Sequence, residues 1–222
     1  MKTLWIVGLG TPGRCTVAAQ EAVRHADRLF LQTAEHPSCR WIAEEGIAAE
    51  TMDALYNEAE DFDELNEAIA ERLLAEENGE TVVYAAPGRG IEGTAQMSEI
   101  LTLAKERGIK VRRIPGIGYA DTALCEIDPF ENSPVVCTAV EVTERSIDVS
   151  LPLVIEELDT VIKAGEVKLH LMEYYPEEWP VQLIYMNESG EYQVKEFPLY
   201  ELDRKRDFFA ATVLALAPVP FA

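Results

Sequence analysis

The sequence predicts an α/β protein in which a parallel sheet comes first and a mixed sheet follows. Two observations lead to this fold class. Apolar, strand-like runs alternate with helical patterns over the first half, which is typical of a parallel sheet with helices on both faces. Stretches with period two dominate the second half, which is typical of antiparallel strands. Three of the predicted strands run directly into loops that contain glycine; the strand and loop pairs are Leu4–Val7 with Gly8–Gly13, Thr81–Val83 with Pro87–Gly90, and Val111–Ile114 with Pro115–Gly118.

The first half alternates strands and helices in chain order. Thr16 is a candidate N-cap for the first helix, and Gly108 stands where a helix commonly ends. Strands are predicted at 3–8, 28–32, 80–85 and 110–114, and helices at 15–26, 37–45, 61–76 and 93–107.

The second half begins with a short helix near 118–126 and contains both kinds of strand pairing. The segment 167–172 fits either a helix or the start of a strand. The change of pattern places a domain boundary after Ile114, which gives domains at 1–114 and 115–222. Strands are predicted at 134–138, 153–155 and 209–216, with a hairpin formed by 181–186 and 192–197.

Charge and composition exclude several classes of partner. The chain has 40 acidic and 19 basic residues, a formal net charge of −21, so nucleic acids and anionic membranes would be repelled. No apolar run is long enough to span a bilayer, and we expect no leader before the first strand. We therefore expect a soluble, cytoplasmic protein. The four cysteines and three histidines are scattered, so we expect buried free thiols and no metal site.

The three glycine-bearing loops are the strongest functional signal. Ligands of open α/β sheets bind outside the carboxyl ends of the strands, and glycine lets backbone groups approach a ligand closely. For any one of these loops taken alone, plain turn chemistry is the favoured explanation. Because three loops share one relative position, a small-ligand site is the better interpretation.

The order of several short motifs resembles the tetrapyrrole (corrin/porphyrin) methylase family. It is most similar to the methylase-like domain that precedes MazG-type pyrophosphohydrolases. No such domain follows within these 222 residues, so we expect a free-standing methylase-like unit. The matching motifs include Val7–Gly10, Thr33–Pro37, Met52–Tyr56, Val83–Gly88, Ile114–Gly118, Ile127–Pro129, Val167–Leu169, Tyr175–Pro176 and Pro198–Asp203.

The resemblance implies two α/β domains with a ligand cleft between them, S-adenosylmethionine as cofactor, and a homodimer. It also implies a set of cofactor contacts. These are Leu9 in the first loop, Pro87, Gly88, Arg89, Gly90 and Ile91 in the second, Gly118, Tyr119 and Ala120 in the third, and Thr138, Ala139, Leu171 and Met172 further along the chain.

Two loops depart from the family pattern. Arg14 stands where an aspartate is common, and Arg89-Gly90 replaces a His-Pro or Asp-Pro pair, with Thr94 near the position of a glutamate. An arginine in place of an aspartate replaces a negative charge with a positive one, and this change would act on the cationic groups of the cofactor. Altered cofactor binding, a different acceptor or lost catalysis are the possible consequences.

The predicted function is S-adenosylmethionine-dependent methyl transfer to a small molecule. Tyr56 is the candidate catalytic base, and an amphipathic tyrosine packed at a helix start explains it equally well. Two alternatives remain open at this point. One is a peptide-backbone N-methyltransferase, and the other is a non-catalytic module that binds the cofactor or a nucleotide.

We also expect a symmetric homodimer formed by the segment from Asp53 to Leu74 and parts of the second domain. Aromatic residues are enriched at interface centres, and we expect several in the second half to remain exposed in a monomer. They are Tyr174, Tyr175, Trp179, Tyr185, Tyr192, Phe197, Tyr200, Phe208, Phe209 and Phe221.

Overall fold

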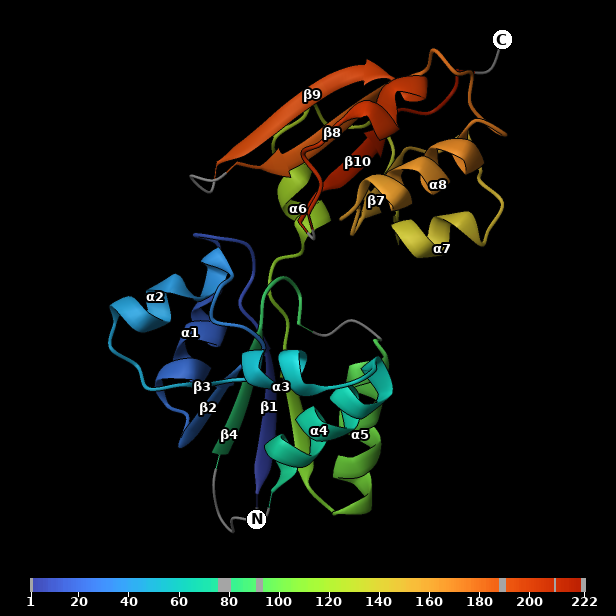
Figure 1. Ribbon diagram of the computed structural model, residues 1–222. Helices are drawn as coiled ribbons and strands as arrows, with labels where there is room; N and C mark the ends of the chain where they lie inside the picture. The colour runs from blue at the N-terminus through green and yellow to red at the C-terminus, as the bar shows by residue number, and fades with distance from the viewer. Residues whose placement is uncertain (1, 76–80, 91–93, 188–190, 210, 221–222) are drawn as a thin grey trace. The chain divides into compact units, whose positions relative to one another are not determined.

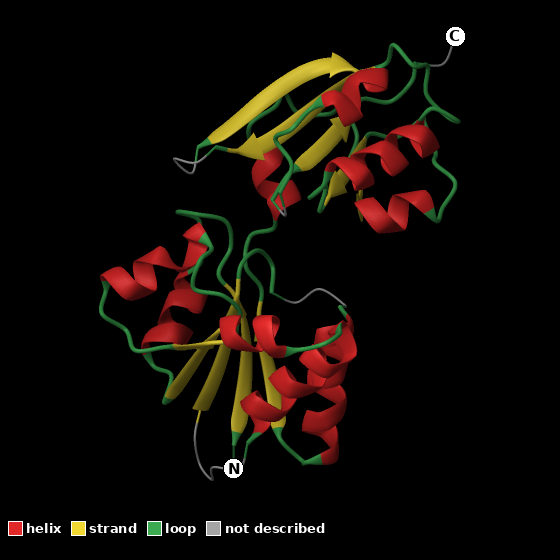
Figure 2. Cartoon of the chain, viewed as in Figure 1, coloured by secondary structure: helices red, strands yellow, loops and turns green. Residues whose placement is uncertain are grey.

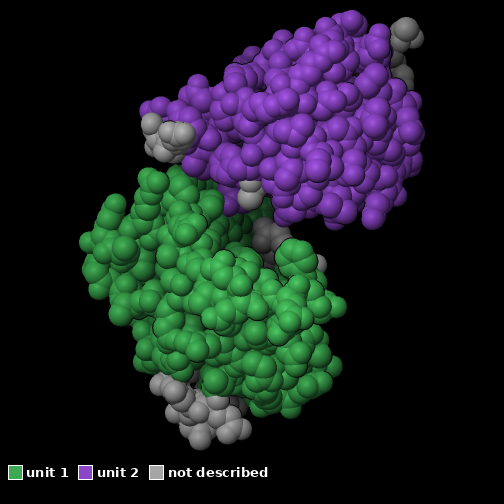
Figure 3. All heavy atoms as spheres, viewed as in Figure 1, with its two compact units in different colours: residues 1–118 green, residues 119–222 purple. Residues whose placement is uncertain are grey.

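The structure is a computed structural model that describes residues 2–75, 81–90, 94–187, 191–209 and 211–220 (Figure 1). The chain divides into two compact units, residues 1–118 and 119–222 (Figure 3). Each unit contains one five-stranded sheet with helices on its two faces (Figure 2). The predicted hairpin turn falls partly at 188–190, outside the described residues.

The sheet of the first unit is parallel throughout, as the sequence predicts. Its strand order is β3-β2-β4-β1-β5. β3 has only two residues and gave no strand signal in the sequence. The strands are β1 (Thr3–Gly8), β2 (Arg28–Leu31), β3 (Glu50–Thr51), β4 (Thr81–Ala86) and β5 (Lys110–Ile114).

Helices cover both faces of this sheet. Helices α1 (Val17–Arg24) and α2 (Arg40–Glu44), the latter preceded by the 3-10 turn η1 (Pro37–Cys39), pack against one face. Helices α4 (Phe62–Leu74) and α5 (Ala95–Glu106) pack against the other. The short helix α3 (Asp53–Glu58) lies in the interval between the predicted helices at 37–45 and 61–76.

Side-chain caps fix where these helices begin. The Thr16 hydroxyl accepts the Ala19 N–H at 3.2 Å, which confirms the predicted cap. Asp61 and Thr94 cap α4 and α5 in the same way. Such caps satisfy N–H groups that have no partner within the helix.

The sheet of the second unit is mixed, also as predicted. Its order is β6-β7-β10-β8-β9; β6 and β7 run parallel, and the other neighbours pair antiparallel. The last strand is shorter than the predicted 209–216. The strands are β6 (Val135–Thr138), β7 (Leu153–Glu156), β8 (Pro180–Met186), β9 (Tyr192–Pro198) and β10 (Val213–Leu216).

The second unit carries helix α6 (Tyr119–Ala123) on one face of its sheet. Helices α7 (Ala139–Thr143) and α8 (Val161–Leu171) and the 3-10 segment η2 (Leu199–Arg204) pack on the other face. The ambiguous segment 167–172 therefore belongs to a helix, which begins earlier than the sequence suggested because Thr160 caps it. In the part of the chain that the structure describes, no helix is long and apolar enough to cross a membrane.

The aromatic residues of the second half are less exposed than expected. Tyr175 and Phe197 are buried, and Tyr174, Trp179 and Phe208 pack against the core of the second unit. The large apolar side chains that this unit exposes are aliphatic, and they lie mainly on β6, α7 and α8.

Candidate functional site

Three loops meet at the carboxyl edge of the first sheet. They follow β1, β4 and β5, which lie side by side. From β1 the chain continues through α1 on one face to β2, and from β4 it continues through α5 on the other face to β5. The connections after β1 and β4 thus leave in opposite directions, which makes this the topological switch point where open α/β sheets bind ligands.

Backbone hydrogen bonds join the three loops directly. The Gly10 N–H donates to the Gly88 carbonyl at 2.9 Å, and the Gly88 N–H donates back to the Gly10 carbonyl at 3.0 Å. The Leu9 N–H donates to Ala86 at 2.8 Å, and the Gly116 N–H to Arg89 at 3.0 Å. We call this arrangement of residues 8–10, 86–90 and 116 the loop cluster.

The glycines of the loop cluster allow the loops to approach one another. A Cβ atom on Gly8 would lie 2.0 Å from the Arg89 carbonyl oxygen, and one on Gly116 would lie 2.2 Å from the Gly88 oxygen. One on Gly90 would lie 2.6 Å from the Gly8 Cα. No side chain fits in such space without moving backbone. Gly88 has φ of 68°, a conformation that favours glycine.

The sequence suggested that these glycines allow a ligand to approach the backbone, whereas the structure shows that they allow the loops to approach one another. Their missing side chains make room for neighbouring loops, and four loop N–H groups already donate to loop carbonyls. The Leu9 side chain is fully buried in the core and is accessible only through its backbone, while Pro87 and Arg89 are half-buried. Ile91 lies outside the described residues.

A polar cluster follows β2 and β3 at the same edge. The Tyr56 hydroxyl, on α3, accepts a hydrogen bond from Gln32 Nε2 at 3.2 Å, and the tyrosine is 42% exposed. Asp53 accepts the Ala34 N–H at 3.0 Å. Burial raises the pKa of Asp53, but this hydrogen bond and those from Thr33 and Thr51 outweigh it and leave the pKa below its usual value. Tyr56 therefore has a fixed hydroxyl that solvent and a ligand can reach.

A second contact ties this region to the loop cluster. The buried Ser38 hydroxyl donates to the Gly10 carbonyl at 2.8 Å. The Ser38 N–H in turn donates to Nδ1 of His36 at 3.2 Å, so that nitrogen must be unprotonated. Burial lowers the pKa of His36, in agreement with a neutral ring.

In the second unit, Ala120, Thr138 and Ala139 gather at the carboxyl end of β6 and β7. Thr138 is paired with Glu156 in the strand register, and the Ala120 N–H donates to Glu156 Oε1 at 2.6 Å. Thr138 also begins α7 with a capping box formed with Glu141. Sequence reasoning missed Glu156, whose signal is a carboxylate at the last position of a buried strand.

The next residue, Glu157, has a backbone φ of 60°. Non-glycine residues rarely adopt this conformation, and strain of this kind concentrates at functional sites. Gly118 and Tyr119 lead from the third loop to Ala120, which is fully buried. Residues 118–120, 138–139 and 156–157 therefore form a second set of candidate ligand contacts.

The structure separates Leu171 and Met172 from this second set. Helix α8 starts after β7 and runs back along the sheet, so its last residues lie at the amino end of β7. Two observations support this placement: His170 contacts the Arg145 carbonyl at 2.9 Å, and burial together with the charge of Asp148 raises the pKa of Tyr175 to about 12. Leu171 is fully buried in the core, so its side chain is not available to a ligand.

Three of the four cysteine thiols are at least partly buried, whereas Cys125 is exposed. Burial raises the pKa of Cys15, Cys39 and Cys137 to about 11 in each case, and a protonated thiol is a poor nucleophile. Among the residues that the structure describes, no group of three or more His, Cys, Asp or Glu side chains could hold a metal ion.

A sequence model of the Tetrapyrrole (Corrin/Porphyrin) Methylases matches residues 3–185. The chain belongs to the tetrapyrrole methylase family. The likeness to the methylase-like domain that precedes MazG-type pyrophosphohydrolases stays a prediction. The YabN protein of Bacillus subtilis (strain 168) is 25% identical over 215 residues, which cover 96% of this chain and 44% of that protein. The chain thus spans less than half the length of this relative.

Solved structures of methyltransferases share the fold of this chain. The uroporphyrin-III-C-methyltransferase of Thermus thermophilus superposes with a TM-score of 0.71 at 21% identity, covering 97% of this chain and 94% of that one. A cobalt precorrin-4 methyltransferase gives 0.68 at 14% identity, with 97% and 94% covered. A diphthine synthase gives 0.64 at 17% identity, with 100% and 92% covered. These likenesses confirm the predicted fold class.

Proposed function

We propose that this tetrapyrrole methylase family member transfers a methyl group from S-adenosylmethionine to a small molecule. The observation that carries the proposal is the loop cluster at the topological switch point of a chain whose residues 3–185 match the family. The hydrogen-bonded loops form a preorganised surface at the place where this class of sheet binds its ligands.

The described residues fit the cofactor in one respect. The cofactor is cationic at its sulfonium and amino groups, and Glu156 and Glu157 bring carboxylates to the end of β7. Ala120 and Ala139 are buried in the cores of the second unit, so only their backbone groups could contact a ligand. In the loop cluster, Pro87 and Arg89 are half-buried, so their side chains are within reach of a ligand bound there.

The residues of the chain act mainly by positioning. When bound, S-adenosylmethionine supplies an activated methyl group, so the protein needs no strong nucleophile. Holding donor and acceptor in line contributes several kcal/mol to catalysis. The loop cluster provides the rigid support. Tyr56, whose hydroxyl is oriented by Gln32, is positioned to take a proton from an acceptor hydroxyl or amine or to bind it.

A methyl-transfer assay tests this function. The full chain is incubated with S-adenosylmethionine labelled in its methyl group and with a fractionated extract of small metabolites. We expect label in at least one small-molecule fraction and equimolar S-adenosylhomocysteine. Label found only in peptides would favour a peptide methyltransferase. Cofactor binding without any transfer would favour a non-catalytic module, and either result would contradict the proposal.

We also propose that the protein is a homodimer. The segment from Asp53 to Leu74 exposes two aromatic side chains, Tyr56 and Phe62, and Phe62 is 79% exposed. Exposed aromatic side chains are typical of interface centres. The aromatic residues of the second half contribute less to this argument than the sequence suggested, because several of them are buried within their own unit.

A further inference from the structure

The outer face of α8 carries large apolar side chains. Ile162 is 76% exposed and Leu169 is 65% exposed. They stand seven residues apart and therefore lie on one stripe of the helix. Glu166 follows Ile162 by four residues and extends the same stripe, and the exposed Glu173 lies in the turn after the helix. An outward helix face is normally polar, so this stripe of alternating apolar and acidic residues needs an explanation.

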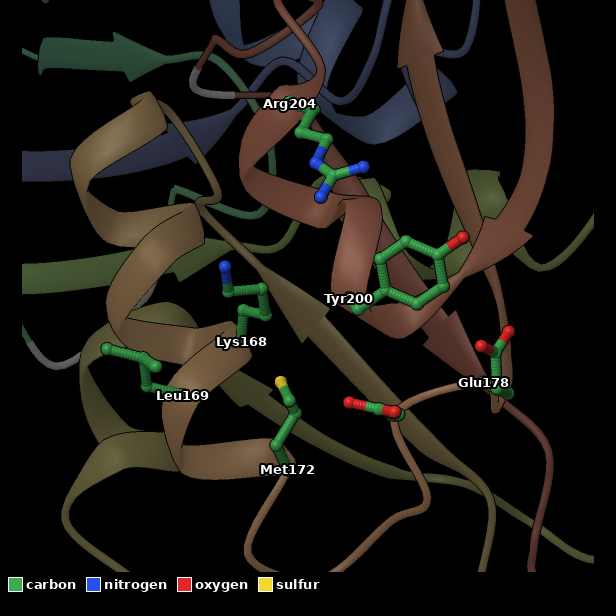
Figure 4. Close-up of a pocket in the computed structure, with 7 residues that line it drawn as sticks. Lys168, Leu169, Met172, Glu178, Tyr200 and Arg204 are labelled. Carbon is green, nitrogen blue, oxygen red and sulfur yellow. The ribbon is translucent and has the colours of Figure 1, made fainter.

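A hollow lies beside this stripe, between α8 and η2. Its volume is about 370 Å³, within the range of ligand-sized pockets. Met172 and Lys168 line it from α8, and Tyr200 and Arg204 line it from η2 (Figure 4). Glu177 and Glu178 line it from the turn before β8. The Met172 side chain and the Tyr200 ring give the hollow apolar surface.

The basic side chains of this surface interact with neighbouring side chains, whereas four of its glutamates form no ion pair with the described residues. Lys168 Nζ forms an ion pair with Asp203 at 2.6 Å, and the Arg204 guanidinium stacks over the Tyr200 ring at 5.2 Å from its centroid. Within the described ranges, Glu166, Glu173, Glu177 and Glu178 form no ion pair. The apolar stripe and the hollow are thus bordered by carboxylates without cationic partners. We call this surface the α8 face.

We propose that the α8 face docks a basic amphipathic helix of a partner protein. Apolar side chains of the partner would pack on Ile162 and Leu169, and one of them would enter the hollow over Met172. Lysine or arginine side chains would meet the unpaired carboxylates. A helix is the expected occupant because the stripe repeats with helical spacing, and an amphipathic helix in an apolar groove is a common mode of recognition.

Charge argues against a second copy of this chain on the same face. A two-fold symmetric contact would place the α8 face against itself. Glu166 and Glu173 would then approach their own copies, and like charges at close contact oppose association. The net charge of −21 adds long-range repulsion. With a basic partner, neither contact between like charges nor long-range repulsion would oppose association.

Peptide titration with NMR detection tests the proposal. The probe is a designed helical peptide of leucine and lysine with an amphipathic pattern, and the same peptide with glutamate in place of lysine is the control. Both are added to the isotope-labelled full chain at moderate salt. We expect the basic peptide to shift amide signals of Val161–Met172 and Leu199–Arg204, and the acidic peptide to leave them unchanged.

Two surface variants separate specific docking from general attraction to an acidic protein. Ile162→Ser with Leu169→Ser should weaken binding at least tenfold, and Glu166→Gln with Glu173→Gln should weaken it and reduce its salt dependence. The matched control, Glu44→Gln with Glu106→Gln, removes the same charge from exposed positions of α2 and α5 and should leave binding unchanged.

Three results would overturn the proposal. One is equal binding by the α8 variants and the control variant. Another is a pattern of shifts spread over the acidic helices of the first unit. A third is movement of the α8 signals on dilution without peptide, which would show that a second copy covers this face. Unfolding curves of each variant confirm that these exposed substitutions leave the fold intact.

Discussion

Gly10 and Gly88 are joined by two reciprocal backbone hydrogen bonds, of 2.9 and 3.0 Å, between the loops that follow β1 and β4. The pair extends the sheet by one short antiparallel bridge beyond the point where the parallel strands end. Because backbone groups make this contact, the positions of the loops depend on the absence of side chains at the glycines. The rigidity of the candidate site therefore follows from its packing.

A methyl group added within the loop cluster should destabilise the protein. In Gly116→Ala the new Cβ would lie 2.2 Å from the Gly88 oxygen and 2.5 Å from the Gly10 nitrogen. We expect the free energy of unfolding to fall by about 1–3 kcal/mol or more. Gly165→Ala is the control, because its Cβ would meet only Asp203 Cβ at 4.0 Å within α8.

In that control, alanine in the helix should raise stability by about 0.5–1 kcal/mol. Denaturant unfolding of the two variants measures both effects. Equal stability of Gly116→Ala and the wild type would show that the loops are not packed as described. Gly88→Val, by contrast, cannot separate binding from folding, because the φ of 68° at this position is already unfavourable for valine.

Much of the fold could be predicted from the sequence because local signals agreed with the tertiary structure. Buried strands such as β1 and β4 are continuous apolar runs, and side-chain caps such as Thr16 mark helix starts. The two-residue strand β3 carried no such signal, since its pairing with β2 arises only in the folded sheet. The start of α8 was missed because its cap, Thr160, follows the β7 strand closely.

The candidate site was less accessible to sequence reasoning. Glycine-bearing loops located the switch point, but sequence cannot show whether the space above a glycine holds a ligand or another loop. Glu156 was missed because the hydrogen bond from Ala120 spans 36 residues. Leu171 and Met172 were grouped with Thr138 by motif, whereas the direction of α8 places them at the other end of β7. The direction of a helix relative to its sheet depends on tertiary packing, which a short sequence motif does not reveal.

Removal of the cap at Thr138 should affect stability and cofactor affinity together. Thr138→Ala removes the capping box of α7, and Thr160→Ala removes the cap of α8. Each should lower the free energy of unfolding by about 1 kcal/mol. Only Thr138 belongs to the candidate contacts, so only Thr138→Ala should weaken S-adenosylhomocysteine binding in calorimetry. Equal affinities of the two variants would remove Thr138 from the site.

Protonation of His36 should couple stability to pH. Burial holds the pKa of folded His36 below its usual value, whereas the unfolded chain takes up the proton near pH 6.5. Between these two pKa values the unfolded state binds more protons, so the free energy of unfolding decreases as the pH falls. His36→Asn keeps a cap acceptor without a titrating ring. Its stability should change less than that of the wild type between about pH 7.5 and 5, measured by denaturant unfolding at each pH.

Loss of the Tyr56 hydroxyl should reduce methyl transfer without unfolding the protein. Tyr56→Phe keeps the ring, which is 42% exposed, and removes the acceptor of the Gln32 hydrogen bond. We expect the transfer rate to fall about 100-fold, the lower range for general acid–base catalysis. Tyr174→Phe serves as the control away from the cluster. An unchanged rate in Tyr56→Phe would exclude a catalytic role for this tyrosine.

The proposed homodimer should depend on Phe62. Sedimentation equilibrium at micromolar concentration should give twice the chain mass of 24.7 kDa in both low and high salt. Phe62→Ser should weaken the dimer at least tenfold, about 1.4 kcal/mol, since this side chain is 79% exposed in a single chain. A mass of one chain in both salt conditions for the wild type would contradict the proposal.

Calorimetric titration of the full chain with S-adenosylhomocysteine tests the central claim most directly. This product analogue needs no methyl acceptor, so the result depends only on the cofactor site. We expect saturable binding of one molecule per chain with a dissociation constant in the micromolar range, about −8 kcal/mol, and loss of affinity in Thr138→Ala but not in Thr160→Ala. Absence of heat with both S-adenosylhomocysteine and S-adenosylmethionine at millimolar concentration, in protein shown to be folded, would contradict the account.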